Sequence, residues 1–218
     1  MRADMKPAQI TAGHIRERMA DTQMPDDPLA VVMPPGSREW PEDLRRKMCE
    51  NLKPAGVLIP IVEHEDDLSV LLTQRSTGLK NHAGQISFPG GRMESADADI
   101  TQTALRETHE EVGIEPDRVD IAGYLPPMLT VTGYAVTPIV GFVAPAISLT
   151  LDRSEVELAF EVPLSFLMDE NNQQSSQREV RGVIVPIIEF NYDHQRIWGV
   201  TANILVELRN ILLSNSVL

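Results

Sequence analysis

Short apolar runs fill the middle of the chain and predict a sheet. The segments "AGVLIPIVEH" (55–64) and "LSVLLTQRS" (68–76) are apolar and β-branched, and the acidic turn "EDD" separates them. This is the pattern of two paired strands. The same texture recurs in three later stretches: "DRVDIAGYL" (117–125), "AVTPIVGFVA" (135–144) and "VRGVIVPIIEFNY" (180–192). Between the last two, we interpret "RSEVELAFEVPLSFL" (153–167) as a turn followed by a short helix.

Helix-like patterns flank and interrupt these strands, at residues 7–20, 40–52, 95–113 and 199–216. The last of them carries apolar side chains at helical spacing, which predicts a closing amphipathic helix. Strands interleaved with only a few helices indicate an α/β fold in which helices cover a mixed sheet. We expect residues 1–52 to form an N-terminal helical arm that wraps the body, and residues 53–218 to form the main domain.

The helix expected over residues 95–113 has signals at both of its ends. Ser95, Asp97 and Asp99 are candidate N-caps, and Gly113 is a candidate stop. At about 100° per residue, the packing side chains fall within an arc of about 140°. These side chains are Ile100, Ala104, Leu105, Thr108 and Val112.

Three carboxylates occupy a neighbouring arc of the same helix. Glu107, Glu110 and Glu111 fall within about 100°, at the spacing where helix side chains meet. An acidic run of this kind is ordinarily a solvated surface. The alternative is a metal site, because Mg²⁺ takes oxygen ligands. A second feature favours the metal site: "GQISFPGG" (84–91) predicts a short strand and a glycine turn, where backbone can approach a phosphate closely.

The charge balance narrows the class of partner. The 218 residues have a formal net charge of −13, whereas a general nucleic-acid surface needs a basic footprint. An anionic substrate would therefore need a cation to mediate its binding. No apolar run is long enough to cross a bilayer, and the first thirty residues lack a secretory signal, so we expect a cytoplasmic protein with no membrane partner. Cys49 is the only cysteine, which excludes an intrachain disulfide and a cysteine-based metal site.

The segment "GGRMESADADITQTALRETHEEVGI" (90–114) resembles the Nudix box, which is Gly, five residues, Glu, seven residues, Arg-Glu, an aliphatic, any residue, Glu-Glu, any residue, Gly and an aliphatic. The matching positions are Gly91, Arg106, Glu107, Glu110, Glu111, Gly113 and Ile114. The stretch from Gly91 to Arg106 is one residue longer than the standard box. Glu94 or Asp97 stands for the usual first glutamate, and Thr108 stands for the aliphatic.

A second signature resembles one branch of that family, the coenzyme A pyrophosphatases of bacteria. Their upstream pattern is Leu-Leu-Thr, six residues, Arg, three residues, Gly, three residues and Phe-Pro-Gly-Gly. The segment "LLTQRSTGLKNHAGQISFPGG" (71–91) matches throughout, except that Lys80 replaces the arginine. The resemblance covers roughly residues 54–213 and leaves only the arm outside it.

The resemblance implies a Nudix-type α/β/α sandwich with a mixed β-sheet, and a requirement for Mg²⁺ or Mn²⁺. It implies hydrolysis of a nucleoside diphosphate derivative. For the coenzyme A branch the products would be adenosine 3′,5′-bisphosphate and 4′-phosphopantetheine or its acyl form. Glu107, Glu110 and Glu111 would hold the metal ions, which neutralise the diphosphate and activate a water. We assign Arg106 an orienting role beside these glutamates.

The two motifs identify the general base and the phosphate-binding residues less closely than the metal ligands. The general base is a glutamate of the box or a later carboxylate, for which the candidates are Glu155 and Glu157, with Glu161 behind them. Arg75, Lys80 and Arg92 lie on the approaches to the turn at Gly90 and Gly91, where they could meet phosphate groups. His82 is a further candidate phosphate donor, although a hydrogen-bonded structural histidine fits the pattern better.

Two other functions fit parts of the same pattern. The first keeps the chemistry and changes the substrate to ADP-ribose, a nucleotide sugar or a dinucleotide, and the replacement by Lys80 leaves it open. The second is a Nudix-fold protein that senses a nucleotide without cutting it, which the three retained glutamates disfavour. A homodimer is compatible with the resemblance, because the family often dimerises.

Overall fold

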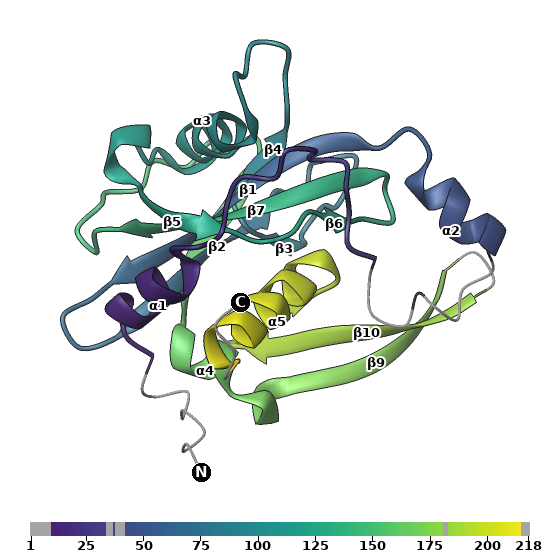
Figure 1. Ribbon diagram of the computed structural model, residues 1–218. Helices are drawn as coiled ribbons and strands as arrows, with labels where there is room; N and C mark the ends of the chain where they lie inside the picture. Colours follow the sequence, from purple (N-terminus) through teal and green to yellow (C-terminus); the bar gives the residue numbers. More distant parts are fainter. Residues whose placement is uncertain (1–9, 34–36, 38–41, 181–182, 215–218) are drawn as a thin grey trace.

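The computed structural model describes residues 10–33, 37, 42–180 and 183–214, and a mixed sheet forms its centre (Figure 1). The main order of the strands is β3-β2-β1-β7-β5, while β4 pairs with β1, β6 with β7 and β8 with β2. The strands of this sheet are β1 (Lys53–Glu63), β2 (Leu68–Arg75), β3 (Ile86–Ser87), β4 (Gly90–Arg92), β5 (Asp120–Tyr124), β6 (Met128–Leu129), β7 (Tyr134–Val143) and β8 (Val156–Pro163). The pair β1 and β7 is parallel, and the other pairs are antiparallel.

Helices cover both faces of this sheet. One face is covered by α3, and α5, with α1 and α4 beside it, covers the other (Figure 1). The helices are α1 (Ala12–Met19), α2 (Glu42–Cys49), α3 (Ile100–Val112), α4 (Leu164–Met168) and α5 (Val200–Leu213), with 3₁₀ turns η3 (Pro116–Arg118) and η4 (Glu170–Asn172). The expected α/β/α sandwich with a mixed sheet is therefore confirmed. No helix in the described part of the chain is both long and apolar enough to cross a membrane.

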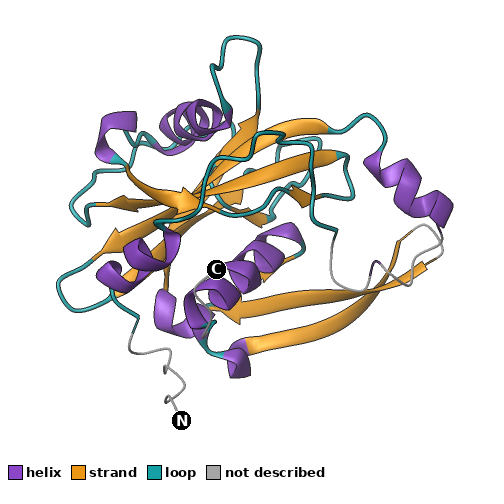
Figure 2. Ribbon diagram, viewed as in Figure 1, coloured by secondary structure: helices purple, strands orange, loops and turns teal. Residues whose placement is uncertain are grey.

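A second, smaller sheet packs against the far side of α5 (Figure 2). It is antiparallel and consists of β9 (Gln173–Val180), β10 (Val183–Tyr192) and β11 (Gln195–Trp198). Phe190 and Ile197 point from this sheet into the core that also holds Leu205 and Leu208 of α5, and all four are inaccessible to solvent. Each such side chain stabilises the fold by about 1.5–3 kcal/mol relative to exposure, so α5 is held by apolar packing on two sides.

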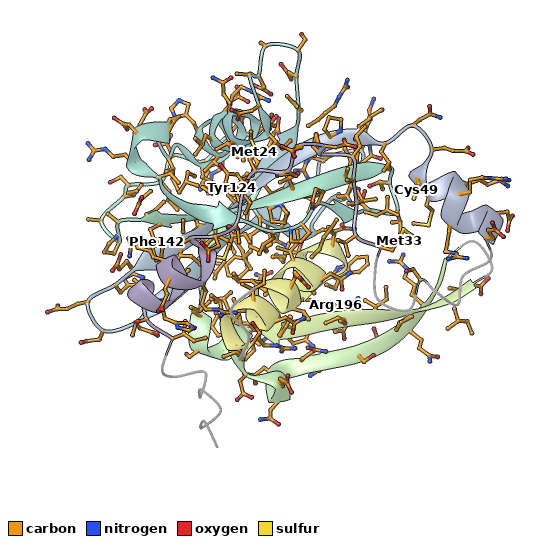
Figure 3. The ribbon with its side chains drawn as sticks, in the orientation of Figure 1. Met24, Met33, Cys49, Tyr124, Phe142 and Arg196 are labelled. Atoms are coloured by element: carbon orange, nitrogen blue, oxygen red, sulfur yellow. The ribbon has the colours of Figure 1, made fainter. Side chains whose placement is uncertain are left out.

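The N-terminal segment contacts the main domain at several points (Figure 3). Ile15 and Met19 of α1 are fully buried in the main core. Thr101 at the start of α3 donates to the sulfur of Met24 at 3.7 Å and bonds the Tyr124 hydroxyl at 3.1 Å. The described part of the predicted arm thus packs on the domain, as expected. Its treatment as a separate region, 1–52, remains a prediction.

Two interpretations of the sequence are corrected by the structure. Residues 153–167 are mainly a strand, because β8 pairs along β2 and only α4 is helical. The alternation of Val156, Phe160 and Val162 with polar positions is the period-two signal that favours a strand. Gly90 and Gly91 were expected to end all regular structure, but they form β4 beside Gly56 of β1.

Several predicted helix ends fall partly outside the described residues. The expected helices at 7–20, 40–52 and 199–216 correspond to α1, α2 and α5, while residues 7–9, 40–41 and 215–216 lie outside the described ranges. The polar strand β9 and the short strand β11 were missed. Strand β9, "QQSSQREV", has no apolar alternation to identify it.

Candidate active site

The helix α3 begins and ends where its capping residues predict. Asp99 is the N-cap, and its side chain accepts the Gln102 N–H at 2.8 Å. Gly113 ends the helix with φ 76°, and this left-handed conformation favours glycine. Of the five expected packing residues, four are buried: Ile100, Ala104, Thr108 and Val112. The remaining one, Leu105, is partly buried.

The glycine turn lies directly against the acidic side of α3. The Gly90 N–H donates to Glu111 Oε2 at 3.1 Å. A Cβ on Gly91 would lie 2.3 Å from Cδ of Glu107, and a Cβ on Gly56 would lie 2.5 Å from the Ile100 carbonyl oxygen. Such distances are accessible only to glycine, so Gly91 of β4 and Gly56 of β1 allow these two strands to approach the helix. The sequence analysis missed Gly56, although a glycine inside a strand signals close backbone approach.

Arg106 forms hydrogen bonds with three acidic side chains of the site. Its Nε and Nη2 donate to the two oxygens of Asp97 at 2.9 and 3.0 Å. Its Nη1 donates to Glu107 Oε1 at 2.9 Å and to Glu110 Oε2 at 3.0 Å. The predicted contact between Arg106 and the glutamates is therefore present. The Arg106 guanidinium holds the pKa of Asp97 well below its usual range, and these carboxylates raise the pKa of Arg106. Asp97, rather than Glu94, is the acid that meets Arg106.

The three glutamates of α3 differ in exposure. The Glu111 side chain is 3% exposed, that of Glu107 is 17% exposed and that of Glu110 is 57% exposed. Burial raises the pKa of Glu111 to about 7, although the Gly90 N–H and the Arg75 charge act against the shift. Burial also raises the pKa of Glu107, while Arg106 opposes it. The buried Glu111 and the partly buried Glu107 are thus incompletely compensated as carboxylates, so a nearby positive charge would favour their ionised forms.

The three later carboxylates lie at different positions along the chain: Glu155 directly precedes β8, and Glu157 and Glu161 lie on that strand. The negative charge of Glu155 raises the pKa of both Glu107 and Glu111, whereas that of Glu157 is not among the charges that do so. The turn before β8 is anchored at the site, because Ser76 N–H donates to the Glu155 carbonyl at 2.8 Å. Glu161 lies five residues from Val156 along the strand, about 16 Å away. There it contacts His64, at 2.6 Å between Nε2 and Oε2.

The basic candidates lie around the same turn, at different depths. Arg75 is partly buried, with Nη1 3.5 Å from Glu111 Oε1. The loop that carries Lys80 and His82 begins after Arg75 and folds back onto it. The Arg75 N–H donates to the Gln85 carbonyl, and the Gly84 N–H donates to the Arg75 carbonyl. Lys80 and His82 are exposed, and His82 Nδ1 bonds the Gln85 side chain at 2.8 Å. Arg92 is exposed on β4, and its carbonyl accepts from Arg106 at 3.3 Å.

The donor set at this centre fits a hard divalent cation. Within the described ranges, no three His, Cys, Asp or Glu side chains are already arranged around one metal position. Glu107 and Glu110 turn toward Arg106, and Glu111 turns toward Gly90. The carboxylate oxygens of Glu107 and Glu111 are nevertheless buried with raised pKa values, and a cation would compensate that charge. The residues present therefore fit a metal such as Mg²⁺.

Comparisons with known proteins agree with this geometry. The NUDIX domain family model matches residues 52–203. A protein of Enterobacter sp. (strain 638) named "Uncharacterized Nudix hydrolase NudL" is 41% identical over 168 residues, which cover 76% of this chain and 87% of that protein. The protein of the same name from Salmonella newport (strain SL254) is 42% identical over 158 residues, or 72% of this chain and 82% of that one.

A solved structure is similar at lower identity. The crystal structure of a MutT/nudix family protein from Enterococcus faecalis has a TM-score of 0.48 and 16% identity, covering 73% of this chain and 61% of that chain.

An acidic helix pressed against a glycine turn, within an α/β/α sandwich, defines the class as hydrolases of phosphoanhydride bonds. The chain belongs to the Nudix hydrolase family and is a pyrophosphohydrolase. Enzymes of this family generally use divalent metal ions.

Proposed function

We propose that this protein is a coenzyme A pyrophosphatase. It hydrolyses the diphosphate bond of coenzyme A or its derivatives with Mg²⁺ or Mn²⁺. The products are adenosine 3′,5′-bisphosphate and 4′-phosphopantetheine or its acyl form. The observation that carries the proposal is the meeting of two sequence signatures at one carboxylate. Gly90, a fixed position of the upstream signature, and Arg75, at one of its variable positions, both contact Glu111 of the Nudix box.

The metal ligands in this proposal are Glu107, Glu110 and Glu111. When bound there, Mg²⁺ or Mn²⁺ supplies a Lewis acid that neutralises the diphosphate and activates water for attack. The buried negative charge of Glu107 and Glu111 supports this role, because a carboxylate shielded from water binds a cation in a low dielectric. Arg106 orients Glu107 and Glu110 through its two Nη1 contacts.

The general base in this proposal is Glu155. Its carboxylate accepts the proton of the attacking water, and Glu157 and Glu161 have no such part. Support comes from the electrostatic effect of Glu155 on Glu107 and Glu111. The 2.8 Å bond between the Ser76 N–H and the Glu155 carbonyl also fixes the backbone that carries this side chain. Glu161 is committed to His64 and Ser69 at the other end of β8.

The substrate contacts come from the turn and the loop before it. Gly91 lets β4 lie directly against the Glu107 carboxyl group. The Arg75 and Arg92 guanidinium groups offset the substrate charge. Lys80 and His82 lie on the exposed loop and reach the outer phosphates of the substrate. Lys80 keeps the positive charge of the arginine that it replaces but loses its bidentate geometry. The substrate is a small nucleotide-diphosphate molecule.

Product analysis by chromatography tests the proposal. The purified protein is incubated with Mg²⁺ or Mn²⁺ and, separately, with coenzyme A, ADP-ribose and a diadenosine polyphosphate. We expect metal-dependent release of adenosine 3′,5′-bisphosphate from coenzyme A, faster than cleavage of the other compounds. Faster cleavage of ADP-ribose or the dinucleotide would keep the glutamates and refute the coenzyme A assignment. Binding of these compounds without cleavage would favour a nucleotide sensor.

A further inference from the structure

The loop between β7 and β8 joins two parts of the proposed catalytic centre. It runs from Val143 to Val156, and its last residue is Glu155. Before it reaches Glu155, the loop contacts the C-terminal end of α3, the helix that carries Glu111. The position of Glu155 relative to Glu111 therefore depends on how this loop is held.

Two backbone bonds fix the loop to the end of α3. The Thr150 N–H donates to the Val112 carbonyl at 3.0 Å, and the Asp152 N–H donates to the Glu111 carbonyl at 3.0 Å. The last carbonyls of a helix have no partner within the helix, so these bonds also satisfy them. The loop packs closely here, since a Cβ on Gly113 would lie 3.0 Å from the Thr150 nitrogen. Asp152 is thus joined directly to the backbone of a proposed metal ligand.

Asp152 also organises the turn that carries Glu155. Its carbonyl accepts the Glu155 N–H at 3.0 Å and the Val156 N–H at 2.8 Å. Its Oδ1 accepts the Ser154 N–H at 2.8 Å and the Ser154 hydroxyl at 2.7 Å. A side chain that accepts the N–H two residues further on forms an Asx turn, which holds the backbone in a bend. Asp152 therefore contacts both segments, Glu111 through its N–H and Glu155 through its carbonyl.

The Glu155 side chain depends on this backbone for its direction. Glu155 is exposed, and within the described ranges no hydrogen bond or ion pair holds its carboxylate. Its backbone is held on both sides, because its N–H bonds Asp152 and its carbonyl accepts the Ser76 N–H at 2.8 Å. The turn at Asp152 and the end of β2 therefore aim this carboxylate together.

We infer that Asp152 is a positioning residue that fixes Glu155 relative to Glu111. Asp152 does not touch the substrate or the reacting atoms, and its effect on turnover passes through Glu155. The inference rests on the proposed role of Glu155 as the general base. A general base must lie within hydrogen-bond reach of the proton that it accepts. A carboxylate on a loosened turn spends less of its time within that reach.

Steady-state kinetics of two Asp152 variants tests this role, with saturating Mg²⁺ and with coenzyme A and ADP-ribose as parallel substrates. Asp152→Ala removes the acceptor of Ser154. We expect kcat to fall about 10-fold with KM within about twofold, because a displacement of about 1 Å at a catalytic group costs up to 10²-fold. Asp152→Asn keeps a side-chain oxygen for the Ser154 N–H, so kcat should stay within about threefold of wild type. Equal losses in the two variants would overturn the inference.

Asp169→Ala is the matched control. Asp169 forms the same kind of turn, in which its Oδ1 accepts the Asn171 N–H at 2.9 Å and the Asn171 side-chain amide at 2.8 Å. This turn follows α4, on the face of the sheet opposite to α3 (Figure 1). Its loss should leave kcat within about twofold. A fall in kcat as large as that of Asp152→Ala would overturn the inference, because any loosened turn would then impair the enzyme.

A double variant separates the aim of Glu155 from general damage. In a Glu155→Gln background, adding Asp152→Ala should lower kcat by less than about twofold more, because both changes act on the same step. A further 10-fold loss would show that Asp152 does not act through Glu155 and would overturn the inference. So would a Glu155→Gln variant with unchanged kcat, which leaves the coenzyme A assignment intact. Cleavage of ADP-ribose alone would refute that assignment, and the kinetics with ADP-ribose would still test Asp152.

Amide hydrogen exchange in EDTA, followed by nuclear magnetic resonance, gives a readout that needs no turnover. We expect Asp152→Ala to speed exchange at the Ser154 and Glu155 amides at least about threefold, because local opening of the turn becomes easier. The Thr150 amide is the internal control, since its bond to Val112 does not involve the Asp152 side chain. Unchanged exchange at Ser154 and Glu155 would overturn the inference, because the turn would then hold without that side chain.

Discussion

The helices α3 and α5 cover opposite faces of one sheet, and each carries a buried charged side chain. Glu111 of α3 is 3% exposed and Arg209 of α5 is 5% exposed. The surroundings of the two charges differ. Glu111 accepts the Gly90 N–H and faces Arg75, whereas Arg209 has only the neutral amide of Gln173. Burial alone therefore does not describe either site.

The difference lies in how each charge is compensated. At α3, donors from three separate segments converge on acids that still repel one another, and the pKa of Glu111 remains raised to about 7. A bound cation would compensate the negative charge of these glutamates. At α5, the neighbouring core is apolar, and Nε and Nη1 of Arg209 have no acceptor among the described residues. The first arrangement fits a site that holds a cation, whereas the second leaves two buried donors unpaired.

Removal of the α3 charge should have the largest effect on turnover. We expect Glu111→Gln to lower kcat by about 10³-fold, the size seen when one group that stabilises transition-state charge is removed. The matched control is Glu207→Gln, which removes a partly buried acid from α5 and should leave kcat within about twofold. Steady-state kinetics with saturating Mg²⁺ measures both. Equal losses of kcat in the two variants would contradict the assignment of the catalytic acids to α3 rather than α5.

The next largest effect should come from the general base. Glu155→Gln is expected to lower kcat by about 10²-fold, the lower end of what a positioned base contributes. Glu157→Gln, two residues along β8, should change kcat by less than about twofold. The pH profile gives a second readout, because loss of the base removes the acidic limb of kcat. Equal and mild losses in the two variants would identify both as ordinary surface acids.

A third prediction concerns the closeness of the turn to α3. In Gly91→Ala, the new Cβ would meet the Glu107 carboxyl group at 2.3 Å, so that side chain must move. A displacement of about 1 Å at a catalytic group costs up to 10²-fold in rate, and we expect a loss of about 10-fold in kcat. Gly78→Ala is the control, since its Cβ would have only the Ser76 hydroxyl nearby, at 3.7 Å. Full activity of Gly91→Ala would mean that Glu107 can vacate its position.

A fourth effect should appear in stability rather than in turnover, and its direction depends on pH. The pKa of Glu111 rises from 4.5 to about 7 on folding. The folded protein therefore holds more protons than the unfolded chain between these values, and the free energy of unfolding falls as pH rises through this window. At pH 8 the metal-free protein should be destabilised by on the order of 3 kcal/mol relative to a chain that lacks this acid.

Urea unfolding in EDTA at pH 4 and pH 8 measures this effect in wild type and in Glu111→Gln. The variant should be more stable than wild type at pH 8 and similar at pH 4. Addition of Mg²⁺ at pH 8 should stabilise wild type and leave the variant unchanged. A wild type that is the more stable of the two at pH 8 without metal would show that Glu111 is fully compensated by Gly90 and Arg75.

The sequence predicted much of the site because its residues are close together in the chain. The acidic arc, the cap at Asp99 and the stop at Gly113 lie within one helix, where spacing alone decides which side chains meet. The pairing of Arg106 with the glutamates followed from the same spacing. The choice between Asp97 and Glu94 did not, because it depends on how the loop before α3 turns back to the helix.

The fold class and the acidic face of α3 were determined by the sequence alone, since each is encoded in local periodicity or in a short motif. Only the tertiary structure decided that Gly90 and Gly91 form β4, that the charge of Glu155 rather than that of Glu161 acts on Glu111, and that Nε and Nη1 of Arg209 lack an acceptor among the described residues. These features depend on which segments pair across the sheet and how deeply each charge is buried. Long-range pairing and burial are properties of the packed chain, and local sequence does not contain them.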